Sequence, residues 1–188
     1  MCSELLYGYH RGKIMTKSLI HKMTRLALLL AIGVVINYAE AVLLPLAFIA
    51  PGVKLGLANT IGLIVLYYFG IKEYISIGFL RVILTALFTG FGFNFYIAIS
   101  GWALATIVVV IFHYWQRLSI FGLSMASAVM HGVGQIIMVA ILYQNKYIIN
   151  YLPILFFTGI ASGLIIAVIA REVVTRVRLT TSLDEYEK

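Results

Sequence analysis

The sequence has little charge for its length. Only 11% of its 188 residues are charged, whereas 62% are hydrophobic, and the mean hydropathy is +1.02. A soluble domain carries a charge at about a quarter of its positions. A chain with less than half that share has too few charged residues for a well-hydrated surface. The composition therefore excludes an ordinary soluble domain and indicates a membrane protein.

Cysteine and aspartate each occur once. The single cysteine, Cys2, excludes an intramolecular disulfide, and the four histidines form no cluster with it that would build a zinc site. The single aspartate, Asp184, lies near the C-terminal end, which excludes a mechanism that needs paired aspartates in the body of the chain. We therefore expect no bound metal and no cofactor.

Six apolar runs are long enough to cross a bilayer. A hydrocarbon core of about 30 Å needs about 17 to 25 apolar residues per helix. Unpaired backbone groups are unfavourable in lipid, and the runs lack the alternation of barrel strands, so we expect helices. The predicted fold is an all-α integral membrane bundle of six transmembrane helices, over Leu26–Leu44, Leu55–Ile71, Tyr74–Gly90, Phe95–His113, Ile120–Tyr143 and Leu152–Ala170.

The net charge of +7 comes mainly from the two ends of the chain, so it indicates membrane topology and no nucleic-acid partner. Basic residues flank the first and last spans, at Arg11, Lys13, Lys17, Lys22, Arg25, Arg171, Arg176, Arg178 and Lys188. Because positive charge favours the cytoplasmic side, we predict a multi-pass plasma-membrane protein with both termini in the cytoplasm.

The same pattern predicts three parts. They are a cytoplasmic N-terminal extension over residues 1–22, a six-helix membrane domain over 23–178 and an acidic cytoplasmic tail over 179–188. A secretory signal is the alternative for the first span, because Ala39-Glu40-Ala41 resembles a cleavage site. The apolar run exceeds a signal core of about 7 to 15 residues, which favours a membrane helix.

Polar side chains within the spans are candidate functional groups, because a charge at mid-membrane costs about 2.5 to 3.5 kcal/mol on insertion scales. Arg81 lies midway along its span, and Glu40 is the only carboxylate within any predicted span. With the predicted topology these groups lie in the outer half or near the midplane, which predicts a pocket that opens outward. The candidate substrate-binding residues are Asn37, Glu40, Lys54, Asn59, Arg81, Asn94, His131 and Gln135.

Structural roles remain open for several of these residues. Arg81 can bond to helix carbonyls or pair with Glu40, which itself can lie at the membrane interface. Lys54 can extend to the outer surface. His131 and Gln135 lie one turn apart, as in pairs that hydrogen-bond between membrane helices.

Small residues recur four apart, which predicts close helix contacts. Ser124, Ala128 and Gly132 form such a face in the fifth span, and Gly159 and Gly163 form one in the sixth. Ala27 and Ala31 do so near the basic end of the first span, where we expect a partner subunit to dock.

Two stretches of the sequence are typical of a known family. Ala50-Pro-Gly-Val-Lys-Leu-Gly-Leu-Ala-Asn59 and His131-Gly-Val-Gly-Gln135, together with Arg81, resemble the Gx transporter family, labelled heptaprenyl diphosphate synthase component I. More broadly, the chain resembles the S components of energy-coupling factor (ECF) transporters over about Met23 to Arg178. The resemblance implies a six-helix capture module whose external first loop covers a pocket, and whose Ala27 and Ala31 face docks a T subunit driven by two ATPases.

The resemblance implies a non-enzymatic, substrate-binding protein for a small organic molecule, and Lys54 and Arg81 favour an anionic one. The chain contains no G-x-x-x-x-G-K-[ST] loop, so ATP must be bound by partners. One alternative is a membrane accessory component of a heptaprenyl diphosphate synthase that binds a prenyl diphosphate, and another is a structural scaffold. Catalysis of prenyl elongation is not expected, because it resembles Mg²⁺ chemistry on aspartate-rich motifs, and the chain has one aspartate.

Overall fold

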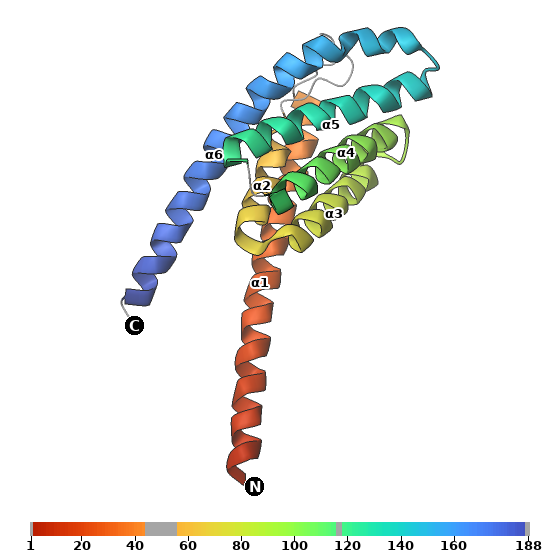
Figure 1. Ribbon diagram of the computed structural model, residues 1–188. Helices are drawn as coiled ribbons and strands as arrows, with labels where there is room; N and C mark the ends of the chain where they lie inside the picture. The colour runs from red at the N-terminus through yellow and green to blue at the C-terminus, as the bar shows by residue number, and fades with distance from the viewer. Residues whose placement is uncertain (1, 44–55, 116–117, 187–188) are drawn as a thin grey trace.

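The computed structural model describes residues 2–43, 56–115 and 118–186, and describes side chains over 19–40, 56–115 and 118–176. Throughout these ranges the regular structure is helical, with no strand (Figure 1). The helices are α1 (Cys2–Leu43), α2 (Ala58–Phe69), α3 (Ile71–Thr89), α4 (Phe93–Trp115), α5 (Ile120–Leu142), the 3-10 helix η2 (Lys146–Tyr151) and α6 (Leu152–Tyr186).

Four helical segments of the described chain are long and apolar enough to cross a membrane. They are Leu19–Glu40 within α1, the helices α4 and α5, and Lys146–Arg176, which contains η2 and most of α6. This confirms a helical membrane protein. The count of six spans stays a prediction, because α2 is short and α3 carries three charges, at Lys72, Glu73 and Arg81.

Helix α2 is shorter than the second span that the sequence predicts. Its 12 residues extend only about 18 Å at 1.5 Å per residue. Gly56 and Gly70, on either side of it, have φ angles of 71° and 102°, a left-handed region that favours glycine. Gly70 ends the helix and donates its N–H to the carbonyls of Val65 and Leu66.

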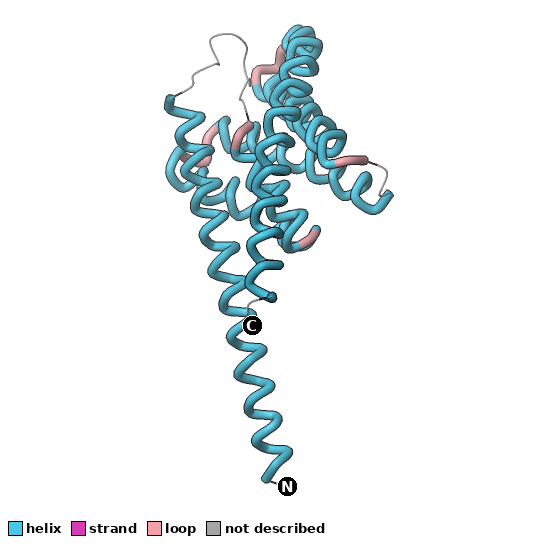
Figure 2. Tube along the Cα trace, turned by 90° about the vertical axis from the view of Figure 1, so that its left-hand side faces the viewer, coloured by secondary structure: helices cyan, strands magenta, loops and turns pink. Residues whose placement is uncertain are grey.

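Helix α5 packs mainly against α4 and α6, whereas α1 packs on α2 and α3, and α2 also contacts α3 and α6. The first part of α1 and the last part of α6 project beyond the bundle toward the same end (Figures 1 and 2). This arrangement agrees with two termini on one membrane side, although which side stays a prediction. Both helices also run unbroken through the boundaries predicted at residues 22 and 178.

Glycines bring α6 very close to α5. A Cβ atom added to Gly163 would lie 2.7 Å from Met125 Cα, and one added to Gly159 would lie 3.0 Å from Val129 Cα. The short distance lets the Ser124 hydroxyl donate to the Gly163 carbonyl at 2.7 Å. The close helix contacts predicted for the small residues of the fifth and sixth spans are confirmed for Gly159, Gly163 and Ser124.

We predict that Gly163→Ala lowers the free energy of unfolding by about 1 to 3 kcal/mol, the usual range for overpacking. The new methyl group would meet the α5 backbone, which cannot rotate away. Thermal unfolding of the purified protein in detergent measures the effect. Gly92→Ala is the matched control, because no heavy atom lies within 4 Å of that position, and equal losses in the two variants would contradict the prediction.

Candidate ligand-binding site

One buried cavity collects most of the polar residues that the sequence singles out. It lies among α1 to α5 and has a volume of about 30 Å³, room for one or two water molecules. Six of the eight predicted substrate-binding residues line it, namely Asn37, Glu40, Asn59, Arg81, His131 and Gln135. Side chains that are far apart in the sequence therefore meet at one place.

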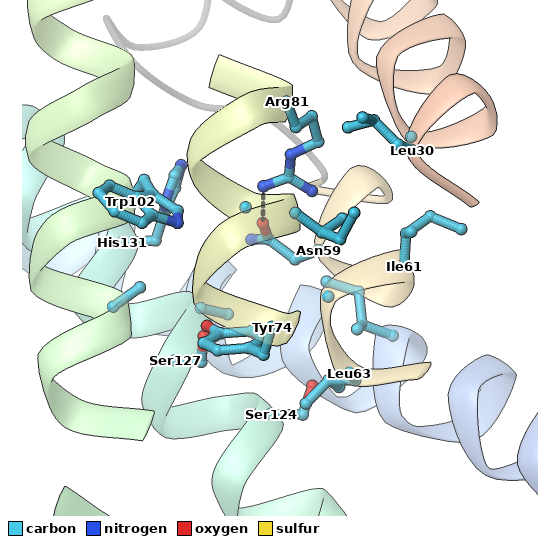
Figure 3. Close-up of a pocket in the computed structure, with 17 residues that line it drawn as sticks. Leu30, Asn59, Ile61, Leu63, Tyr74, Arg81, Trp102, Ser124, Ser127 and His131 are labelled. Carbon is cyan, nitrogen blue, oxygen red and sulfur yellow. Dashed lines mark hydrogen bonds between the residues drawn. The ribbon is translucent and has the colours of Figure 1, made fainter. Parts of the chain in front are cut away.

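Arg81 connects α3 to the start of α2. Its side chain is buried, with 8% of the residue exposed, and it donates to the Ala58 carbonyl and, at 3.1 Å, to Asn59 Oδ1 (Figure 3). The predicted structural role, bonding to a helix carbonyl, is confirmed. Among the described residues Arg81 forms no ion pair with Glu40, and its Nε is buried without a hydrogen-bond partner.

Two contacts fix α1 beside Arg81. Gly33 leaves room for the arginine, because a Cβ added there would lie 3.4 Å from Arg81 Cδ. One turn further along, Asn37 Nδ2 donates to Thr85 Oγ1 at 3.1 Å, and the Thr85 hydroxyl donates to the Arg81 carbonyl at 2.8 Å. The polar groups of α1 and α3 thus hold the two helices together at the cavity.

Glu40 is buried inside the helix bundle. It is 5% exposed, and its carboxylate accepts the backbone N–H of Leu57 at 2.8 Å. Leu57 immediately precedes α2, so this bond secures the same helix start that Arg81 contacts. Glu40 is therefore already used in positioning α2.

Two neighbouring cavities extend the polar centre, and Asn59 and His131 line them as well. The one in Figure 3 measures about 20 Å³ and is also lined by Trp102, Tyr74 and Ser127. Trp102 Nε1 is buried without a hydrogen-bond partner among the described residues. The sequence did not single out Trp102, but its place in the middle of a span, away from the interfacial belts where Trp is common, is a detectable signal.

The remaining predicted residues lie elsewhere. Asn94 is exposed in the first turn of α4 and does not line the cavity. Lys54 and the whole loop expected to cover the pocket, residues 45–54, lie outside the described residues. Ala27 and Ala31, predicted to dock a partner, are both exposed on α1.

We predict that Glu40→Ala destabilises the protein by about 1 to 3 kcal/mol, because it removes the acceptor of the partly buried N–H of Leu57. Glu40→Gln keeps an acceptor oxygen and should lose clearly less. Thermal unfolding in detergent compares the two variants with the unchanged protein. Equal stability of Glu40→Ala and the unchanged protein would show that the bond contributes nothing.

Comparisons with known proteins identify the family. A family model described as heptaprenyl diphosphate synthase component I matches residues 29–173. Searches of curated proteins and of solved structures found no significant match. The matched segment runs from α1 to α6 and contains every predicted binding residue, including all six that line the cavity. The chain therefore belongs to the heptaprenyl diphosphate synthase component I family.

Proposed function

We propose that this protein is the substrate-binding S component of an ECF-type transporter, which captures a small organic molecule for ATP-driven transport by partner subunits. The observation that carries the proposal is the meeting of six polar side chains from α1, α2, α3 and α5 at one buried cavity. Polar groups inside a membrane bundle are costly and usually functional.

The polar centre favours a ligand with hydrogen-bond acceptors. Arg81 contributes a permanent positive charge, and Asn37, Asn59 and Gln135 contribute amide groups. The only carboxylate at the cavity, Glu40, already accepts the N–H of Leu57. An anionic or zwitterionic organic molecule matches this balance of charge better than a cation does.

The cavity must enlarge before it binds such a molecule. Sites for small molecules usually measure about 300 to 1,000 Å³, whereas the three cavities here measure about 20 to 30 Å³ each. Because Asn59 and His131 line all three, a small separation of the helices around these side chains would join them. On this proposal the described conformation is closed.

Energy must come from partners, because the chain has no phosphate-binding G-x-x-x-x-G-K-[ST] loop. The proposed partners are a transmembrane T subunit and two ATPases. Ala27 and Ala31 support a docking role, because they are exposed and lie on one face of α1, where small residues let another helix approach.

We predict that Ala31→Trp abolishes co-purification with a T subunit and its ATPases while the isolated protein keeps its melting temperature. The bulky ring would block a close helix contact on an exposed face. Ile32→Trp, one position round the same helix and 42% exposed, is the matched control and should co-purify. Assembly of the Ala31 variant at the level of the control would remove this face from the proposal.

We predict that native mass spectrometry of the purified protein detects a retained small molecule, and that Gln135→Leu reduces its occupancy at least tenfold. Gln135 is 3% exposed and lines the cavity, so its loss removes a polar contact at nearly constant volume. Asn94→Leu, outside the cavity, should keep the ligand. Equal occupancy in both variants would place the ligand elsewhere.

The family name favours a second candidate, an accessory membrane component of a heptaprenyl diphosphate synthase that binds a prenyl diphosphate without reacting it. An apolar groove between α1 and α3, next to the basic start of the first span, is compatible with such an amphiphile. The co-purifying partner separates the candidates. A prenyl synthase subunit in place of a T subunit and ATPases would favour this second function.

A further inference from the structure

A groove between α1 and α3 is much larger than the cavities of the polar centre. Its volume is about 400 Å³. Apolar side chains from both helices form most of its wall, and polar residues gather at the start of α3. The lining residues are Met23, Leu26, Ala27, Leu30, Lys72, Glu73, Ser76, Ile77 and Leu80.

The groove has a polar end and an apolar end, because α1 and α3 run parallel. Lys22 of α1 pairs with Glu73 of α3, and Gly33 of α1 faces Arg81 of α3. The second contact lies closer to the C-terminal end of both helices. The groove lies between these two contacts, which are about 16 Å apart along α1 at 1.5 Å per residue. Its polar end is at the basic end of the bundle, and its apolar end points toward the middle.

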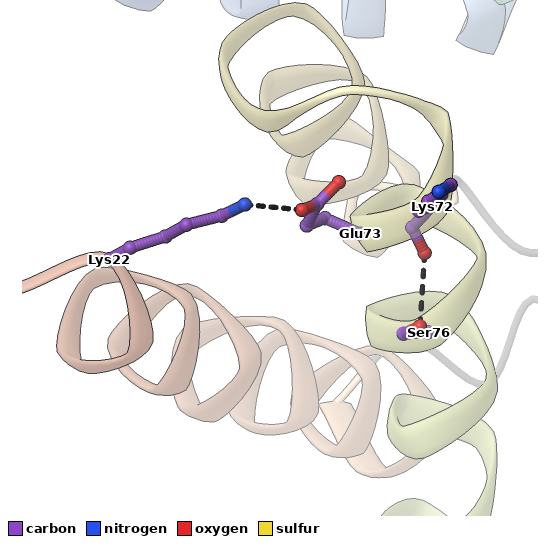
Figure 4. A network of polar contacts seen from close by, with 4 residues as sticks. All are labelled: Lys22, Lys72, Glu73 and Ser76. Atoms are coloured by element: carbon purple, nitrogen blue, oxygen red, sulfur yellow. Dashed lines mark hydrogen bonds and ion pairs between the residues drawn. The ribbon is translucent and has the colours of Figure 1, made fainter. Parts of the chain in front are cut away.

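The polar end carries a net positive charge. Lys22 reaches across from α1 to Glu73, and the two charges offset each other (Figure 4). The hydrogen bond from Lys22 lowers the pKa of Glu73, so this carboxylate stays ionised at neutral pH. Lys72 is exposed and forms no ion pair with any described residue, which leaves its charge available at the mouth of the groove.

We propose that this groove binds one anionic phospholipid, with an acyl chain along the apolar wall and the phosphate at Lys72. Basic side chains at the membrane surface attract anionic lipids. The Lys22–Glu73 pair crosses the gap between the helices at this end, and a single acyl chain can lie along the groove without breaking it. The assignment does not depend on the proposed transport function.

The test is native mass spectrometry of the full chain. The protein in detergent is mixed with phosphatidylglycerol or with phosphatidylcholine that has identical acyl chains, and the detergent is then removed in the spectrometer. We expect one phosphatidylglycerol per protein to survive detergent removal, and phosphatidylcholine to bind at least about fivefold more weakly. Lys72→Gln should lower the affinity for phosphatidylglycerol about fivefold. Lys146→Gln is the matched control, because Lys146 is an exposed lysine in η2, away from the groove.

A second variant tests the apolar wall. Ala27→Trp fills the groove from an exposed position and should abolish retention of phosphatidylglycerol at an unchanged melting temperature. Equal binding of the two lipids, or equal effects of the Lys72 and Lys146 variants, would overturn the proposal. A protein that binds farnesyl diphosphate but does not bind phosphatidylglycerol would also overturn the proposal, because the groove would then be a binding site for a prenyl diphosphate. Retention of a small molecule at Gln135 is measured separately, so the two proposals fail independently.

Discussion

A buried arginine in an apolar bundle is the constraint on which the other polar contacts depend. The Arg81 side chain is buried, so its N–H groups need acceptors inside the protein. The first turn of α2 supplies them, through the Ala58 carbonyl and the Asn59 side chain. Glu40 binds the backbone just before that turn. Together, these two charged residues attach the short helix α2 to its longer neighbours α1 and α3.

The same contacts define what the site can offer a ligand. The side chains of Asn37, Glu40 and Asn59 are engaged with Thr85, Leu57 and Arg81, so their first role is to position helices. Arg81 and Gln135 also line the cavity, and among the described residues Arg81 Nε has no hydrogen-bond partner. A ligand that enters would therefore replace some of the hydrogen bonds between helices with hydrogen bonds to the ligand. Binding would then be coupled to a small movement of α1, α2 and α3.

Hydropathy located the central helices well because polar or charged residues end their apolar runs. The fourth and fifth spans were predicted as Phe95–His113 and Ile120–Tyr143, and α4 and α5 agree within two residues. Helix α2 is shorter than predicted at both ends, where Gly56 and Gly70 have positive φ angles that a hydropathy profile does not show. Helices α1 and α6 are longer, because polar turns beyond the membrane leave no trace in a hydropathy profile.

The site was predictable where a polar residue stands out in an apolar run, as Arg81 and Gln135 do. Asn94 was included among the predicted substrate-binding residues because the sequence indicates its depth in the membrane but not the direction of its side chain. In the structure Asn94 is exposed. Trp102 was missed although it lies in the middle of a predicted span, and Tyr74 was missed because aromatic residues are common in such helices and only the packing shows that it lines a cavity. The family was identified from the motifs that the matched segment contains, whereas the ECF role stays a proposal.

The central claim is that Arg81 and Asn59 act together to hold α2 against α3. A double-mutant cycle of Arg81→Met and Asn59→Ala, followed by reversible unfolding in detergent, measures this directly. We predict a coupling free energy of about 1 kcal/mol, since hydrogen bonds between membrane helices average about 0.6 kcal/mol and reach about 1.7 kcal/mol. Losses that add to within about 0.3 kcal/mol would show two independent residues and contradict the account.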